Sequence, residues 1–265
     1  FKVASNTDTI YYSKTQNPKI VFVTFKEADK SSYTGDIVIP QEIEVEGKKY
    51  IVGGIGNSAF KNCNTLTSVS LPIGIEYIGD DAFYNCQFLN TVNIEDSDTE
   101  LQIGYSYEGY DEYGPFYDSP LTNVYLGRDI IQVDDDGVAS AADGWEEGVF
   151  SNFKYKDESW ETTFSIGNKV TKITDYMFSH TCVKYLYIYP AIESIGKYAF
   201  YNCKKFQGLS CNHTTPPTLG ENAFEDCDNM WYIKVPETSI ESFQNADGWS
   251  EFNKNNKFDK NVIFA

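Results

Sequence analysis

Apolar positions along this chain recur in one short phrase. Each clear copy consists of an aliphatic residue and a glycine, two variable positions, alanine and phenylalanine, two more variable positions and a cysteine. These copies occupy residues 55–63, 78–86, 195–203 and 219–227, and degenerate copies centre on Phe116, Phe150 and Phe178. The recurrence indicates a solenoid, because a unit of this length cannot bury its own apolar face and stacked neighbours bury it together.

The spacing of the phenylalanines predicts where the stack carries extra chain. The interval is 23 residues from Phe60 to Phe83 and 22 residues from Phe178 to Phe200, but it is 33 residues from Phe83 to Phe116. Core positions must keep register with their neighbours, so inserted residues have to leave the stack as loops. We therefore expect insertions within residues 95–165.

A second apolar pattern follows the phenylalanines and ends in an alternation of apolar and polar residues. Its apolar members are Leu66, Val69 and Leu71, then Leu89, Val92 and Ile94, then Leu121, Val124 and Leu126, then Val183, Leu186 and Ile188, and finally Met230, Ile233 and Val235. Such alternation predicts a half-buried strand. One strand per unit, stacked in one direction, makes a parallel sheet with strands about 4.8 Å apart. The Ala-Phe turns would form the opposite wall.

The combined pattern, intact at residues 55–72, resembles the BspA-like leucine-rich repeats of bacterial surface proteins. The resemblance covers residues 54–235, and the flanking segments 33–50 and 214–249 look like the ends of the same family. It implies a leucine-rich-repeat solenoid with a short parallel β-sheet on one face and turns and short helical segments on the other. It also implies an extracellular or cell-surface location. Since residues 1–5 do not look like a signal peptide, it further implies that one was removed from the natural chain.

Three parts are expected along the chain. Residues 1–53 form an N-terminal β cap, residues 54–235 form a solenoid of about seven units, and residues 236–265 form a C-terminal cap. In the first part, residues 19–25 and 42–45 predict antiparallel strands, the latter beside a turn at Glu46-Gly47.

The C-terminal cap is expected to contain a short helix. Thr238 to Glu241 matches a capping box, and Ile240 and Phe243 share the helix face that can close the last coil. Trp249 and Phe252 can pack beneath it. A solenoid covered at both ends is expected to be a monomer, or at most a weak dimer.

Charge and composition narrow the choice of partner. The 265-residue chain has a net charge of −18, which argues against nucleic acid and against an anionic membrane surface. Two interpretations of this charge stay open, namely solubility outside the cell and attraction of a cation or basic partner. The chain has no run of 18 apolar residues, so no transmembrane segment or membrane insertion is predicted.

The six cysteines are predicted to be structural. Cys63, Cys86, Cys203 and Cys227 each follow a phenylalanine by three residues, which places them in one inward-pointing column. Buried free thiols are favoured over disulfides, because the Cβ directions of stacked coils are parallel. A bridge and a metal site are the alternatives, but no Cys-x-x-Cys pair exists and only His180 and His213 could assist.

Enzyme chemistry has little support in the sequence. Cys211 lies two residues before His213, but a strand would bury both on one face, so we interpret the pair as chance adjacency. Residues 134–137 suggest a calcium loop, but its twelfth position is Trp145 where a glutamate is expected, so a solvated turn is favoured. No phosphate loop, zinc helix or nucleophile elbow occurs. We predict no enzymatic activity and no cofactor.

Candidate binding residues come from the positions that alternate with the inward ones. The strand pattern predicts an outward row of Ser70, Asn93, Tyr125, Tyr187, Ser210 and Lys234, with Tyr185 and Tyr232 beside it. Tyrosine provides contact area and a hydroxyl, which suits recognition. Strand propensity alone could also explain tyrosines on an exposed sheet face.

A second candidate surface lies in the segment 105–115. Its tyrosines Tyr105, Tyr107, Tyr110 and Tyr113 alternate with acidic residues and glycines. Stacking does not require these residues, and such long loops are usually functional or disordered. The segment could contact a partner or fold back over a sheet edge.

Two functions follow as hypotheses. The first is a non-enzymatic adhesion protein whose sheet face and central loops recognise a host protein or glycan, as the family resemblance implies. The second is a structural spacer or assembly module of a larger surface protein, without a ligand site of its own.

Overall fold

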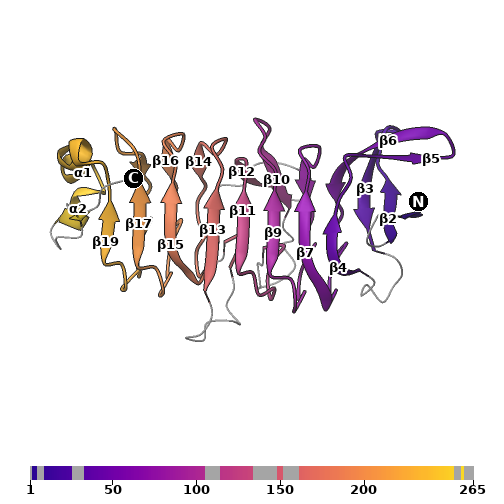
Figure 1. Ribbon diagram of the computed structural model, residues 1–265, viewed down its shortest axis with the longest axis horizontal. Coiled ribbons are helices and arrows are strands. Elements are labelled where there is room, and N and C mark those ends of the chain that lie inside the picture. Colours follow the sequence, from indigo (N-terminus) through magenta and orange to yellow (C-terminus); the bar gives the residue numbers. More distant parts are fainter. Residues whose placement is uncertain are drawn as a thin grey trace.

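A computed structural model of the protein describes residues 2–4, 9–25, 33–104, 114–133, 148–151, 161–253 and 258–259. The chain forms an elongated stack of coils, with β2 (Thr9–Lys14) and β3 (Ile20–Thr24) at one end and two short helices at the other (Figure 1). A sheet runs along the whole stack. The predicted solenoid fold is confirmed.

Nine strands form this sheet, and every neighbouring pair is parallel. In spatial order they are β4 (Thr34–Val38), β7 (Thr65–Leu71), β9 (Thr91–Ile94), β11 (Asn123–Leu126), β13 (Thr162–Ile166), β15 (Val183–Ile188), β17 (Gly208–Cys211), β19 (Tyr232–Lys234) and β20 (Phe258–Asp259). All fifteen apolar strand residues predicted to face inward are buried. Consecutive coils therefore stack in the register that the alternation predicted.

A second set of short strands was not expected from the sequence. They lie at the Ile-Gly position of the repeat and pair in parallel from coil to coil. They are β8 (Tyr77–Ile78), β10 (Leu101–Gly104) and β12 (Ile130–Val133), and then β14 (Lys172–Ile173), β16 (Ser194–Ile195) and β18 (Thr218–Leu219). Four of the six, β8, β14, β16 and β18, have two residues each and are too short to show an alternation in the sequence.

The N-terminal region contains the predicted antiparallel pairs. β1 (Lys2–Ala4) pairs with β2, and β2 pairs with β3, both antiparallel. β5 (Glu42–Val45) and β6 (Lys48–Ile55) form a hairpin across Glu46 and Gly47, whose positive φ angles suit a two-residue turn. β3 is parallel to β6, and β4 already belongs to the nine-stranded sheet. The proposed division at residues 53 and 235 stays a prediction.

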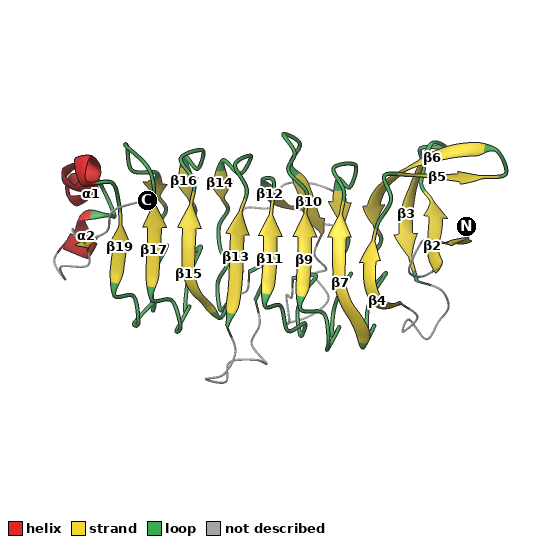
Figure 2. Cartoon of the chain, viewed as in Figure 1, coloured by secondary structure: helices red, strands yellow, loops and turns green. Residues whose placement is uncertain are grey.

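Helices in the described part of the chain lie at its C-terminal end (Figure 2). A 3₁₀ turn, η2 (Glu237–Ser239), leads into α1 (Ile240–Asn245), and α2 (Ser250–Asn253) follows. Phe243 is buried and Ile240 packs on the core, as predicted.

The predicted capping box is wrong. Thr238 lies inside the 3₁₀ turn, so the N-cap of α1 is Ser239. Ser239 has helical φ and ψ, and its hydroxyl makes no capping bond. The end of the solenoid is instead closed by Trp249, whose indole N–H donates to the carbonyl of Pro217 at 2.7 Å.

All seven repeat phenylalanines form one continuous stack behind the sheet. The centroid distances are 4.8 Å between Phe60 and Phe83, 5.0 Å between Phe83 and Phe116, and 5.0 Å between Phe200 and Phe224. Phe150 and Phe178 continue the stack, at 5.5–5.8 Å. Tyr33 extends it at one end and Trp249 at the other. The aromatic core thus runs from cap to cap.

The turns that carry these rings have an unusual backbone. Positive φ recurs two residues before and two residues after the phenylalanine, as at Ser58 and Asn62 around Phe60. Asparagine and aspartate, which tolerate this conformation better than most residues, occupy the later position in five units. Backbone bonds then join the turns of successive coils, as from Phe60 N–H to Ala82 O at 2.7 Å.

The chain's one arginine, Arg128, lies buried between coils. Its guanidinium donates to four backbone carbonyls at 3.0–3.2 Å, those of Pro72, Ile73, Ile75 and Glu95. Burial lowers its pKa from the ordinary value, because the charged form loses water. Arg128 therefore joins its own coil to the carbonyls of the two preceding ones.

We expect Phe83→Ala to lower the free energy of unfolding by about 3–5 kcal/mol, because a buried ring stacked on both faces leaves a cavity. Chemical denaturation measures the loss. Phe88→Ala is the control in the same coil, since Phe88 is 61% exposed and its removal should change stability by less than about 0.5 kcal/mol. A loss below about 1 kcal/mol for Phe83→Ala would contradict a core role.

Arg128→Met should lower the free energy of unfolding by at least about 3 kcal/mol, because each buried carbonyl without a donor costs about 1–3 kcal/mol. Methionine keeps most of the side-chain length but donates no hydrogen bond. Lys49→Met is the matched control, since Lys49 is exposed and its ion pair is with exposed Glu42. Equal denaturation midpoints for the two variants would show that the buried guanidinium does not stabilise the fold.

Candidate binding surface

The predicted outward row lies on one line across the sheet. Strand register aligns the row's members from β7 to β19 in the order Ser70, Asn93, Tyr125, Ser165, Tyr187, Ser210 and Lys234. Each is exposed or half-buried, whereas its neighbours in the strand are buried. The sequence interpretation placed all of them correctly except Ser165, which it did not name.

Tyr185 and Tyr232 form a second aromatic group on the same face. Their rings stack at 6.4 Å although β17 lies between their strands. Gly208 makes this possible, because a Cβ there would lie 2.2 Å from Cζ of Tyr232. The Tyr185 hydroxyl donates to the Gln207 side-chain carbonyl at 2.7 Å, and the Lys234 ammonium lies 5.4 Å from the Tyr232 ring.

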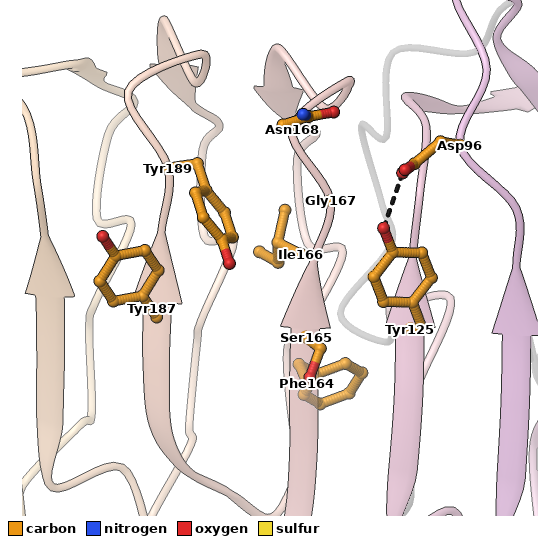
Figure 3. Close-up of a pocket in the computed structure, with 9 residues that line it drawn as sticks. All are labelled: Asp96, Tyr125, Phe164, Ser165, Ile166, Gly167, Asn168, Tyr187 and Tyr189. Atoms are coloured by element: carbon orange, nitrogen blue, oxygen red, sulfur yellow. Dashed lines mark hydrogen bonds between the residues drawn. The ribbon is translucent and has the colours of Figure 1, made fainter.

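A hollow of about 300 Å³ lies on the same face between Tyr125 and Tyr187 (Figure 3). We call it the tyrosine groove, and its lining residues are Asp96, Tyr125, Phe164, Ser165, Ile166, Gly167, Asn168, Tyr187 and Tyr189. Ser165 lies in register between the two tyrosines and is small, which leaves the space open. Tyr189 packs edge-on against Tyr187, with centroids 4.8 Å apart and planes at 73°.

One end of the tyrosine groove is organised by a hydrogen bond. The Tyr125 hydroxyl donates to Asp96 Oδ1 at 2.8 Å. Burial, together with Asp96, raises the pKa of Tyr125 to about 12, so the phenol keeps its proton and remains the donor. A Cβ on Gly167 would lie 2.3 Å from Asp96 Oδ1 and 2.8 Å from the Tyr125 hydroxyl. Glycine at this position therefore allows the pair to form.

The sequence interpretation missed Asp96, Ser165, Gly167 and Tyr189 as parts of this groove. The strand at residues 162–166 was not assigned because Phe164 follows Phe150 by 14 residues, whereas Val124 follows Phe116 by only eight. Its position 14 residues before Phe178, the same distance as from Val69 to Phe83, was the available signal. Asp96 and Tyr189 lie beyond their strands, where alternation predicts nothing. Tyr105, Tyr107, Tyr110 and Tyr113 fall outside the described residues.

The cysteine column has a structural use. All six cysteines are buried and free. The thiols of Cys86, Cys203 and Cys227 each donate to the carbonyl of the phenylalanine one coil earlier, at 2.9–3.0 Å. Ser119 takes the same position in its coil and donates to the Phe83 carbonyl at 2.7 Å. These thiols therefore behave as small buried donors.

Cys211 and His213 are in contact and buried. His213 Nε2 lies 2.8 Å from the Ile192 carbonyl, so this nitrogen carries the proton and Nδ1 accepts from Cys211 Sγ at 3.0 Å. Burial raises the pKa of Cys211 to about 12 and lowers that of His213. Both groups are therefore neutral near pH 7, which does not favour a nucleophilic thiolate.

Within the described ranges, no group of three or more His, Cys, Asp or Glu side chains is arranged to hold a metal ion. In the same residues, no helix is long and apolar enough to cross a membrane. The sequence-based expectations of no metal, no cofactor and no enzymatic activity stay predictions.

Comparison with protein families identifies the repeat. The family model described as "BspA type Leucine rich repeat region" matches this chain in six copies, over residues 53–136 and 150–260. The chain belongs to this family. Its match covers both regular ends of the BspA-type solenoid and part of the stretched middle. The resemblance drawn from the Ala-Phe phrase is thereby confirmed.

Solved structures of other bacterial leucine-rich repeat proteins are similar to this BspA-type chain. A Bacteroides ovatus protein is 18% identical, covering 85% of this chain and 69% of its own, with a TM-score of 0.33. The leucine-rich repeat protein of T. pallidum is 16% identical over 98% of both chains, with a TM-score of 0.45. A Faecalibacterium prausnitzii protein described as a leucine-rich cell surface protein is 13% identical over 94% of this chain and 98% of its own, with a TM-score of 0.29. No curated protein matched.

We expect the six thiols to resist alkylation in the folded protein at pH 8 and to react fully in denaturant. Burial blocks access, and the raised pKa of Cys211 keeps its thiolate fraction small until the pH approaches about 12. Mass spectrometry after brief iodoacetamide treatment measures the labelling of each cysteine. Rapid labelling of Cys211 in the native protein would show that His213 activates it.

Proposed function

We propose that this BspA-type protein is a non-enzymatic binding protein of the cell surface or extracellular space, which recognises a host protein or glycan through the outward face of its sheet. The observation that carries the proposal is the concentration of tyrosines on that face. Tyr125, Tyr185, Tyr187, Tyr189 and Tyr232 all belong to the two groups described above.

Packing supports this assignment over a purely structural role for these rings. Tyr185 is 49% exposed and Tyr189 is 41% exposed, although most other large side chains of the solenoid are buried. Exposed aromatic rings that converge on one face are typical of recognition surfaces, because they present large contact area with few rotatable bonds. A surface location agrees with the description of the F. prausnitzii relative.

The acidic charge of the chain favours neutral or basic partners. Nucleic acid would require a basic face that displaces counterions from phosphate, and the net charge of −18 opposes this. Lys234 lies beside the Tyr232 ring, so a partner at this end would meet a cation next to an aromatic ring. Lys184 lies beside Tyr185, but its ammonium pairs with Glu161 at 2.6 Å.

Replacing Tyr125, Tyr185 and Tyr187 with serine should abolish retention of immobilised matrix proteins and mucin while leaving the melting temperature nearly unchanged. The measurement is solid-phase binding of purified protein, paired with thermal unfolding. The matched control replaces Tyr84, Tyr117 and Tyr201 with serine, because these half-buried tyrosines lie on the opposite, turn-bearing wall. Unaltered retention by the first variant would remove the sheet face from consideration. A wild-type protein that retains none of these components would favour a structural spacer.

A further inference from the structure

We propose that the tyrosine groove binds one ring of an uncharged saccharide. This inference rests on the proposed binding function and names the class of ligand for one part of the sheet face. It depends on the shape of the groove, on the polar groups that point into it and on its charge.

The shape of the groove suits a single flat ring. Tyr125 and Tyr187 come from β11 and β15, which are separated by β13, so two strand spacings of about 4.8 Å each lie between them. Ser165 forms a floor with little bulk, and Figure 3 shows Tyr125 on one side of it and Tyr187 and Tyr189 on the other. The volume of about 300 Å³ is near the lower limit for small-molecule sites, which matches one sugar ring and not a longer segment.

The aromatic rings offer the apolar half of sugar recognition. A pyranose ring has a face of C–H groups with slight positive charge, and the face of an aromatic ring is negative. Tyr187 and Tyr189 stand nearly perpendicular to one another, so together they can contact a face and an edge of the same ring.

Several polar groups of the groove are available to form hydrogen bonds with the hydroxyl groups of a sugar. The Oδ2 atom of Asp96, the hydroxyls of Ser165 and Tyr187, and the side-chain amide of Asn168 make no hydrogen bond within the described part of the chain. A carboxylate accepts hydrogen bonds, whereas a side-chain amide and a hydroxyl can each donate and accept them. This set of donors and acceptors around an aromatic wall matches a polyhydroxylated ring.

The charge of the groove selects against acidic sugars. Asp96 is its one charged lining residue, and no Lys or Arg side chain lines the hollow to balance a carboxylate or sulfate. Lys169 and Arg128 are the cations near Asp96, but the Lys169 ammonium pairs with Asp98 at 2.7 Å and the buried Arg128 guanidinium is held by backbone carbonyls. An anionic ligand would therefore be repelled by Asp96 at short range.

Peptide ligands fit this site less well. Peptides that bind through their backbone add to an exposed strand edge, whereas β13 is paired on both sides. Peptides that bind through an aliphatic anchor need an apolar hole, but the two apolar residues beneath the groove, Phe164 and Ile166, are 4% and 2% exposed. Their surface is already covered by the fold.

Saturation-transfer NMR with neutral disaccharides tests the proposal. The probes are lactose, cellobiose, maltose, mannobiose and chitobiose, with sialyllactose as the acidic comparison. We expect saturable binding of at least one neutral disaccharide and at least tenfold weaker binding of the sialylated probe, which corresponds to about 1.4 kcal/mol. Absence of any saturable neutral binding would overturn the proposal.

Two variants of the groove and one control variant locate the binding. Ser165→Trp fills the groove at an exposed strand position and should abolish the signal, while Ser70→Trp makes the same change in the same row at β7 and should leave it unaltered. Asp96→Asn should weaken the neutral probe about tenfold by removing a charged acceptor. Sugar binding that survives Ser165→Trp would place the saccharide elsewhere and overturn the proposal.

Failure of the saccharide inference can be distinguished from failure of the proposed binding function. If the protein retains a glycoprotein equally well before and after removal of its glycans, and Ser165→Trp has no effect, the partner is a protein and the saccharide inference fails while the binding function stands. If it retains no matrix protein or mucin and binds no disaccharide, both fail.

Discussion

Stacking of phenylalanine rings from coil to coil is the interaction on which the rest of this molecule depends. The rings are 4.8–5.8 Å apart along the run from Phe60 to Phe224, which lies within the range preferred by aromatic pairs. Parallel strands on the opposite wall repeat at about 4.8 Å. Both walls can therefore advance by nearly the same step, and any unit that supplies a ring and a strand joins the stack whatever the length of its loops.

The second constraint on the repeated turns is that their buried backbone N–H and carbonyl groups need hydrogen-bond partners. Backbone N–H groups of a turn donate to carbonyls of the next turn, and the carbonyls of Phe60, Phe83, Phe178 and Phe200 each receive an additional side-chain donor from the following coil. Cysteine and serine both meet this need, as Cys86 and Ser119 show. Arg128 serves the same purpose around Ile73 and Ile75, where one long side chain donates to both backbone carbonyls.

The outer face of the sheet is free to vary in sequence, because the side chains there do not pack into the core. Where large and small residues alternate across neighbouring strands, a hollow or a gap forms between the large side chains. Tyr125, Ser165 and Tyr187 produce a groove, and Tyr185, Gly208 and Tyr232 produce a stacked pair across a gap. A binding surface of this kind needs no change in the core.

Much of this protein was determined by its sequence alone. The period of the Ala-Phe phrase and the two-residue alternation predicted the family, the parallel sheet, the buried cysteine column and the outward row, because each of these is a local pattern repeated many times. The helix cap was predicted wrongly, since Thr238 matched a motif whose backbone geometry the preceding 3₁₀ turn does not provide. Only the tertiary structure decided that Asp96, Ser165 and Tyr189 meet in one groove. They belong to three different coils, and their meeting depends on the pairing of strands that are far apart in the sequence, which no local pattern records.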